Sequence, residues 1–167
     1  MDILLREWKK EDISNVAYYA DNKRIADNLR NVFPYPYTEQ DARGYVESCI
    51  AGNDQEQITR AIVSEGHAVG SIGLFKGTDV YEKSAELGYW LAEDYWGRGI
   101  MSEAVRRICA QGFRQWDIVR IYAEPFAYNT GSRKVLEKSG FVLEGILKNS
   151  VFKNGKIIDS CIYALIK

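Results

Sequence analysis

The sequence predicts an α/β fold built on one mixed, twisted β-sheet of about seven strands, with about four helices around it. Three observations support this: early strand patterns follow one another across short turns, a strong helix separates two central strands, and a hairpin pattern closes the chain. Strands joined by short turns pair antiparallel, whereas a strand–helix–strand unit requires a parallel crossover. We therefore expect a small-molecule crevice where the parallel strands separate.

The first elements are a short strand and two helices. "ILLREW", residues 3–8, is typical of a strand. Residues 9–20 carry apolar side chains at helical spacing, namely Ile13, Val16, Ala17 and Ala20. Pro34 and Pro36 forbid a regular helix in the segment that follows. Thr38 can then cap a second helix over residues 39–51.

The rest of the chain alternates between strand and helix patterns. Strands are expected over residues 57–64, 68–76, 84–92, 118–126, 141–152 and 157–166. The strongest helix covers residues 100–116, with apolar or small residues at helical spacing. A further helix begins at an Asn129 cap and ends at Gly140. Asn154-Gly155 fits a tight turn between the last two strands.

Size and composition indicate one domain over residues 1–167, because 167 residues suffice for one full core. A net charge of −1 argues against a general nucleic-acid or membrane-surface binder. We expect a cytoplasmic protein, because no signal or membrane-spanning pattern is visible. We also expect a monomer or a homodimer. Three dispersed cysteines and a single histidine make a metal site improbable.

The stretch "EDYWGRGIMSEAV" predicts an anion site. Gly97 and Gly99 precede a helix, and a helix N-terminus presents unpaired N–H groups and a positive dipole end. Glycines let the backbone approach a bulky anion closely. The phosphate-binding amides would come from Arg98, Gly99, Ile100, Met101 and Ser102, with the Arg98 side chain adding charge. The alternative is a tight connection without a ligand.

Two common phosphate motifs are excluded. No Gly-Lys-Ser/Thr follows the glycines, so the stretch is not a P-loop. A dinucleotide fingerprint would need Gly or Ala at position 102, where this chain has Ser102. It would also need an acidic residue at the end of the next strand, which only Asp117 or Glu124 could supply, and neither is well placed.

The loop, the strand "RIYAEPFAYN" and the helix "NTGSRKVLEKSGFVLEG" together resemble the GNAT superfamily of N-acetyltransferases. "FPYPYTEQDA" and "KNGKIIDSCIYALI" are similar to the Rim-type branch, which acetylates the N-terminal amines of ribosomal proteins. The resemblance covers essentially the whole chain. It implies that acetyl-coenzyme A (acetyl-CoA) binds here and that an amine receives the acetyl group.

The resemblance also implies cofactor-binding residues. The pyrophosphate would lie on the loop running from Gly97 to Ser102, although Trp96 and Met101 depart from the family pattern. The main chain of Trp90, Leu91 and Ala92 would hold the pantetheine arm and supply an N–H to the oxyanion. Asn129 would contact the same arm and could also cap its helix. Arg133, Lys134 and Lys138 could meet the 3′-phosphate or form a solvated basic face.

The chemistry needs a group that takes a proton from the amine and a donor for the leaving thiolate. Strand alternation puts Glu86 on one face with Gly88 and Trp90, and Glu124 on one face with Tyr122. If their strands are neighbours, either carboxylate could take the proton; ordinary solvated glutamates are the alternative. The resemblance suggests Ser132 for the thiolate, with Tyr128 as a second candidate and helix capping as the alternative role of Ser132.

Two family catalytic positions are changed, to Leu136 and Val151, which leaves a coenzyme A-binding regulatory module without catalysis as the rival function. The resemblance suggests a protein N-terminus as the acceptor, and the fold also serves small amines such as polyamines, amino acids and antibiotics. Phe33, Tyr35 and Tyr37 could form a wall of the acceptor site or fill the core.

Overall fold

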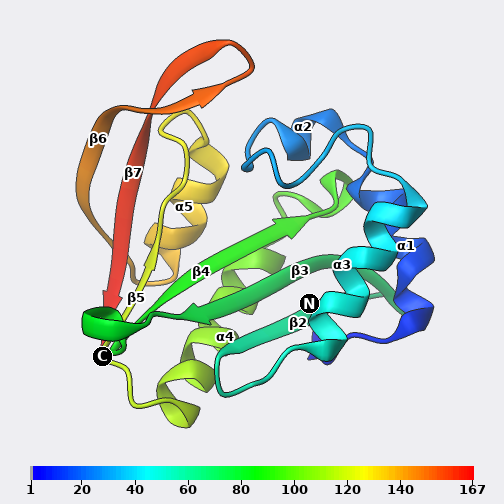
Figure 1. Cartoon of the computed structure of the whole chain (residues 1–167), viewed down its shortest axis with the longest axis horizontal. Helices are drawn as coiled ribbons and strands as arrows, with labels where there is room; N and C mark the ends of the chain where they lie inside the picture. Colours follow the sequence, from blue (N-terminus) through cyan, green and yellow to red (C-terminus); the bar gives the residue numbers. More distant parts are fainter. Residues whose placement is uncertain (1) are drawn as a thin grey trace.

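The computed structural model describes residues 2–167, which form a seven-stranded sheet in the order β1-β2-β3-β4-β5-β7-β6 (Figure 1). The strands are β1 Leu4–Arg6, β2 Gln57–Ser64, β3 His67–Lys76, β4 Ser84–Leu91, β5 Arg120–Ala123, β6 Val142–Lys153 and β7 Lys156–Ile166. All neighbours pair antiparallel except β4 and β5, which are parallel. The prediction of a mixed sheet with one central parallel pair is confirmed.

The helices cover both faces of the sheet (Figure 1). They are α1 Ile13–Ala20, α2 Lys23–Ala26, α3 Glu39–Ala51, α4 Ile100–Gln115 and α5 Thr130–Lys138. Helices α1 and α3 pack on one face in a core that includes Val16 and Val46, and α4 packs on the other with Ile108 and Val105. The strand β4 contributes alternately to both cores, with Trp90 in the first and Leu91 in the second.

Local sequence signals explain most element ends. The side chain of Thr38 accepts a hydrogen bond from the amide of Asp41 at the start of α3, as expected for an N-cap. Asn129 caps α5 in the same way. Asn154 and Gly155 have φ angles of 51° and 75°, the left-handed values that a tight hairpin turn requires.

Three details differ from expectation. The short helix α2 was not predicted, because four residues with a single Asn22 cap give too little periodicity to detect. The helix expected over residues 9–20 begins as a 3-10 turn, and α1 starts only at Ile13. Strand β5 ends at Ala123, well before the expected residue 126, and Pro125 follows with no N–H to donate.

The β6–β7 hairpin projects from the sheet toward α2 (Figure 1). Lys153 Nζ donates to Asn31 Oδ1 at 3.0 Å, and Asn154 Nδ2 donates to Asp27 Oδ1 at 3.0 Å. Two segments that are far apart in the sequence are thus joined above the central strands.

Candidate functional site

The site begins where β4 and β5 separate. Only three residue pairs join the two strands, and the last is Glu86 with Tyr122. The carbonyl of Lys83 accepts from the Val119 amide, so it faces β5. Because strand groups alternate, the main-chain groups of Leu87, Tyr89 and Leu91 share that edge, beyond the last pair.

A cavity of about 940 Å³ occupies this gap. Its walls come from β4, the glycine loop, the end of β5, the start of α5, residues 28–31 and the tip of the β6–β7 hairpin. Such a volume fits a substantial organic ligand. The crevice predicted at the separation of parallel strands is therefore present.

The glycine loop forms one end of the cavity. Gly97 and Gly99 have φ angles of 73° and 78°, and a Cβ added to either would meet nothing within 4 Å. The first hydrogen bond of α4 runs from the Glu103 amide to the Gly99 carbonyl at 3.2 Å. The amides of Ile100, Met101 and Ser102 precede it and have no partner inside the helix. An open, left-handed backbone next to these amides suits a bulky anion.

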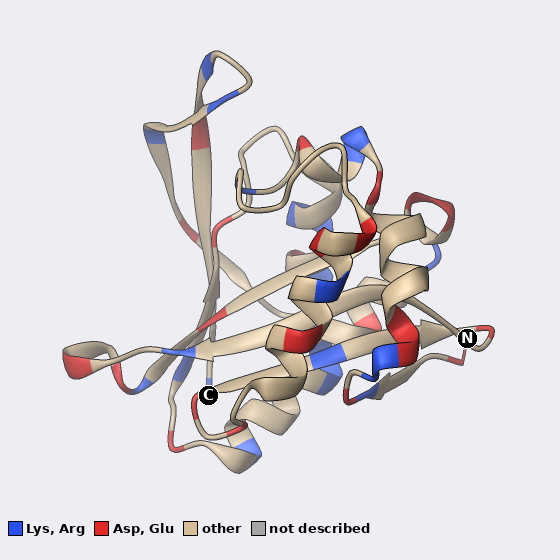
Figure 2. Ribbon diagram, turned by 45° about the vertical axis from the view of Figure 1, so that its right-hand side comes forward, with Lys and Arg blue, Asp and Glu red and all other residues tan. Residues whose placement is uncertain are grey.

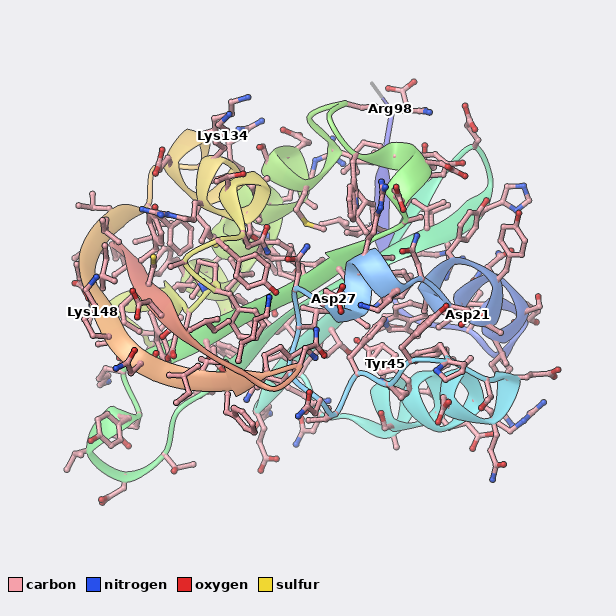
Figure 3. All side chains as sticks on the ribbon, turned by 90° about the horizontal axis from the view of Figure 1, so that it is seen from above. Asp21, Asp27, Tyr45, Arg98, Lys134 and Lys148 are labelled. Atoms are coloured by element: carbon pink, nitrogen blue, oxygen red, sulfur yellow. The ribbon has the colours of Figure 1, made fainter. Side chains whose placement is uncertain are left out.

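The side chain of Arg98 lies differently from the expectation. Its guanidinium lies 4.9 Å from the centroid of the Tyr95 ring, a cation–π contact, and Arg98 is not among the residues that line the cavity within the described chain. Lys134 and Lys138 on α5 do line it. Figure 3 shows Arg98 and Lys134 along the same edge of the molecule. Arg133 instead donates to Tyr163 Oη and to the Ala127 carbonyl, both at 3.1 Å.

The main-chain groups of the three β4 residues expected to hold a ligand do not all face the cavity: those of Trp90 and Ala92 face β3, and those of Leu91 face the cavity. The Ala92 amide donates to the Val69 carbonyl at 2.8 Å, and Trp90 is paired with Ser71 on β3. Leu91 has its carbonyl on the cavity side, where it accepts from Trp96 Nε1 at 2.8 Å. The β4 main-chain groups that face the cavity thus belong to alternate residues, which include Leu91.

The start of α5 brings several polar groups to the cavity. Asn129 Oδ1 accepts from the Ser132 amide at 3.2 Å, and both residues line the cavity. The hydroxyl oxygens of Ser132 and Tyr89 lie 2.6 Å apart. Tyr128 lines the cavity as well, and its hydroxyl donates to the Asp27 carbonyl across the gap.

Sequence reasoning missed Tyr89. It shares the apolar face of Leu87 and Leu91, so alternation alone assigns it to the core. A phenol on a core-facing strand position needs a hydrogen-bond partner, and this requirement was the available signal.

Both candidate carboxylates line the same cavity, as expected for residues on neighbouring strands. Arg30 Nη2 lies 3.5 Å from Glu86 Oε1. Glu124 Oε2 accepts from Ser160 Oγ at 2.9 Å, and Ser160 Oγ lies 2.6 Å from Ser150 Oγ. Burial, followed by the negative charges of Glu86 and Glu124, raises the pKa of Tyr122 between them.

The aromatic residues proposed for the acceptor wall lie elsewhere. Within the described chain, Phe33, Tyr35 and Tyr37 are not among the lining residues. Tyr37 is 6% exposed, and its burial raises its pKa to about 12. Phe33 packs against Trp90 with ring centroids 5.9 Å apart. This segment reaches the cavity through Asn28, Leu29, Arg30 and Asn31 instead.

Lys and Arg residues are interspersed with Asp and Glu residues over the molecule (Figure 2). Residues 2–167 contain no cluster of three or more His, Cys, Asp or Glu side chains with metal-binding geometry. In the same range, no helix has the length and apolar character needed to cross a membrane.

Comparison with known proteins identifies the family. Residues 2–142 match the acetyltransferase (GNAT) domain. The uncharacterised N-acetyltransferase p20 of Bacillus licheniformis is 30% identical over 168 residues, covering 99% of this chain and 93% of the relative. The ribosomal-protein-serine acetyltransferase of Escherichia coli is 33% identical over 146 residues, covering 87% of this chain and 81% of the relative.

The fold of this chain is also similar to that of a solved acetyltransferase. The structure of RimL, a ribosomal alpha-N-protein acetyltransferase in complex with coenzyme A, superposes with a TM-score of 0.86 at 24% identity, covering 98% of this chain and 93% of RimL. The two proteins thus share the fold, including the mixed sheet described above. The chain belongs to the GNAT family of N-acetyltransferases, as its sequence resemblance indicates.

Proposed function

We propose that this protein transfers the acetyl group of acetyl-CoA to a primary amine, the N-terminal α-amine of a ribosomal or other protein. The cavity between β4 and β5 carries the proposal, because the N-terminal ends of both α4 and α5 reach it beside two carboxylates. The choice of acceptor rests on the similarity to the ribosomal-protein-serine acetyltransferase.

The residues present fit acetyl-CoA. The open backbone at Gly97 and Gly99 and the first amides of α4 would hold the pyrophosphate. Lys134 and Lys138 would meet the 3′-phosphate at the rim. The free edge of β4, which includes Leu91, would pair with the amides of the pantetheine arm and offer an N–H to the oxyanion. The bound thioester supplies an electrophilic carbonyl carbon and a thiolate leaving group.

The proton balance of the reaction requires a base that can pass a proton on to solvent. An ammonium acceptor and a thioester give an amide, a thiol and one released proton. The ammonium must lose its first proton before nitrogen attacks the carbonyl carbon. When the C–S bond breaks, its electron pair goes to sulfur, and the second N–H proton neutralises the thiolate. One proton therefore leaves the site in each turnover.

Glu124 is better placed than Glu86 for this role. Glu86 lies beside Arg30, so proton uptake there would break an ion pair. Glu124 meets two hydroxyl groups in series, Ser160 and then Ser150. Ser160 is fully buried and Ser150 is exposed. The series leads from the cavity to the hydroxyl of Ser150, an exposed residue on the hairpin.

The hydroxyl groups of Ser160 and Ser150 can satisfy the hydrogen-bonding needs of Glu124 whether its carboxyl group is ionised or protonated. With the carboxylate ionised, Ser150 donates to Ser160 and Ser160 donates to Glu124. With Glu124 protonated, the direction reverses, and Ser150 can donate to the Leu147 carbonyl 3.0 Å away. No donor is left without an acceptor in either state, which lowers the cost of moving the proton.

Thiol release from acetyl-CoA tests the function. The protein is assayed with N-terminal peptides of ribosomal proteins, the same peptides with a blocked N-terminus, and spermidine. We expect release only with free N-terminal peptides. A preference for spermidine would make the protein a small-amine acetyltransferase. Tight coenzyme A binding without release on any amine would establish a coenzyme A-binding regulatory module.

A further inference from the structure

The hydroxyl groups of Tyr89 and Ser132 form an isolated pair at the cavity wall. Tyr89 comes from β4 and Ser132 from the first turn of α5, and their oxygens lie 2.6 Å apart. Both residues line the cavity. The amide of Ser132 is fixed by Asn129, so the helix end that carries this hydroxyl is itself capped. The pair therefore has a defined position relative to the free edge of β4.

Tyr89 keeps its proton throughout the physiological range. Burial raises the pKa of Tyr89 to about 12; the hydrogen bond with Ser132 acts in the opposite direction, and Cys109 adds a small further rise. Tyr89 is therefore a permanent donor and not a group that loses its proton during the reaction.

Counting protons shows what the pair can offer. Two hydroxyl groups carry two protons, and the hydrogen bond between them uses one. If Tyr89 donates to Ser132, the Ser132 hydroxyl retains one proton for a group in the cavity. A hydroxyl that also accepts a hydrogen bond is a stronger donor, because bonds in a chain polarise one another.

Neighbouring candidates lack this free proton. The Tyr128 hydroxyl donates to the Asp27 carbonyl, which occupies its proton. Leu136 lies one turn beyond Ser132 on α5, is fully buried and has no polar atom in its side chain. Of Tyr128, Ser132 and Leu136, Ser132 is the one whose hydroxyl can offer a proton to the cavity.

We propose that Tyr89 is a positioning residue that donates to Ser132 and directs the Ser132 hydroxyl toward the sulfur of the leaving coenzyme A. The inference rests on the proposed acetyl transfer. As the C–S bond breaks, its electron pair goes to sulfur, and Ser132 donates a hydrogen bond to the thiolate. No proton leaves the pair, and the thiolate takes its proton from the amine nitrogen. The Tyr89 hydroxyl thereby supports the step through Ser132 and does not itself contact the sulfur.

The test is Tyr89→Phe, which removes one hydroxyl and keeps the ring. We expect kcat with saturating acetyl-CoA to fall about tenfold, the effect of one net hydrogen bond, with both KM values unchanged. With S-(4-nitrophenyl) thioacetate as donor, the more acidic thiol leaves without help, so the loss should shrink to less than about twofold. A merely structural role would reduce both rates equally.

A second pair in the protein supplies a matched control. Tyr45 on α3 and Ser71 on β3 also place their hydroxyl oxygens close together, at 2.5 Å, and neither residue lines the cavity (Figure 3 labels Tyr45). Tyr45→Phe should leave the ratio of rates on the two donors unchanged. If Tyr89→Phe behaves like Tyr45→Phe, or loses equally on both donors, the inference is refuted.

Ser132→Ala keeps the test decisive if Tyr89→Phe does not fold. It should show the same dependence on the donor, and the double variant should be no slower than Ser132→Ala alone, because the two residues act as one unit. A wild-type protein that acetylates no amine would refute the proposed function and this inference together. An active wild type with unaffected variants would refute this inference only.

Discussion

Glu124 accepts a 2.9 Å hydrogen bond from the buried hydroxyl of Ser160, whereas Glu86, on the neighbouring strand, lies 3.5 Å from the guanidinium of Arg30. The two carboxylates share one cavity and differ in their partners. From that difference we expect different roles: Glu124 would exchange a proton through hydroxyl groups, and Glu86 would stay paired with a cation.

Replacing each carboxylate by its amide separates these roles. Glu124→Gln should lower kcat/KM for the amine by about 100-fold or more, because the proton acceptor is lost. Glu86→Gln should lower it by less than about fivefold, since it removes only a partly exposed ion pair. Calorimetric titration with coenzyme A checks that both variants bind the cofactor. Equal losses in the two variants would contradict the assignment.

The glycine loop can be tested without altering charge. Gly99→Ala places a side chain at a φ of 78°, a conformation that costs an L-residue about 1–2 kcal/mol. We expect the loop to shift and the Kd of coenzyme A to rise about tenfold. Gly66→Ala is the control: Gly66 has a φ of 82°, open space around it, and a place in the β2–β3 turn. An unchanged Kd in Gly99→Ala would remove the loop from the binding site.

The hairpin tip should control access for the acceptor. Lys153→Met keeps the aliphatic stem but removes the donor to Asn31, so residues 28–31 lose one of their ties to the hairpin. We expect the KM for the acceptor to rise about three- to tenfold while the KM for acetyl-CoA stays the same. Lys148→Met is the control, because exposed Lys148 pairs within the hairpin, with Asp159 at 3.3 Å. A rise in the cofactor KM would show that the tip serves the other end of the cavity.

The pair of Arg6 and Asp12 gives a prediction about stability. Burial, the largest influence, pulls the pKa of Asp12 upward, but hydrogen bonds from Arg6 and from the Lys9 amide outweigh it and leave the pKa below 3.8. A lowered folded-state pKa adds stability above the unfolded value, and this is lost as the pH falls through the folded value.

Asp12→Asn should therefore lower the free energy of unfolding at pH 7 by about 2 kcal/mol, a discounted value because Arg6 is partly exposed. Below about pH 4 the difference from wild type should narrow, because Asp12 then protonates in the unfolded chain. Denaturant titrations at both pH values measure this, with Glu11→Gln, exposed on the same turn, as the control. A difference that is constant with pH would contradict a charge-based role.

Most of the fold could be predicted because its signals are local. The cap at Thr38, the Asn154-Gly155 turn and the 3.6-residue pattern of α4 each involve residues that are close in the sequence. The glycine loop was also predictable, because two glycines directly precede a strong helix pattern. The two carboxylates were predictable because strand alternation assigns side chains to faces. The Tyr89–Ser132 and Glu124–Ser160 contacts were not, because each joins elements whose distance depends on the packing of the whole sheet.

The same limit explains the acceptor wall. Proline and aromatic residues mark Phe33 to Tyr37 as a stiff segment, but the sequence does not say which of its faces turns inward. In the structure Tyr37 and part of Phe33 pack into the core, whereas Tyr35 is exposed. The polar residues before the segment, Arg30 and Asn31, reach the cavity.

The separation of β4 and β5 after three paired residues leaves the middle of the sheet incomplete. A pantetheine arm bound along that edge would take the place of the missing strand, so ligand binding and folding become thermodynamically linked. At a cofactor concentration 100 times its Kd, this linkage adds about 2.7 kcal/mol to the free energy of unfolding. The fraction of the chain that is folded should then rise and fall with the acetyl-CoA concentration of its surroundings.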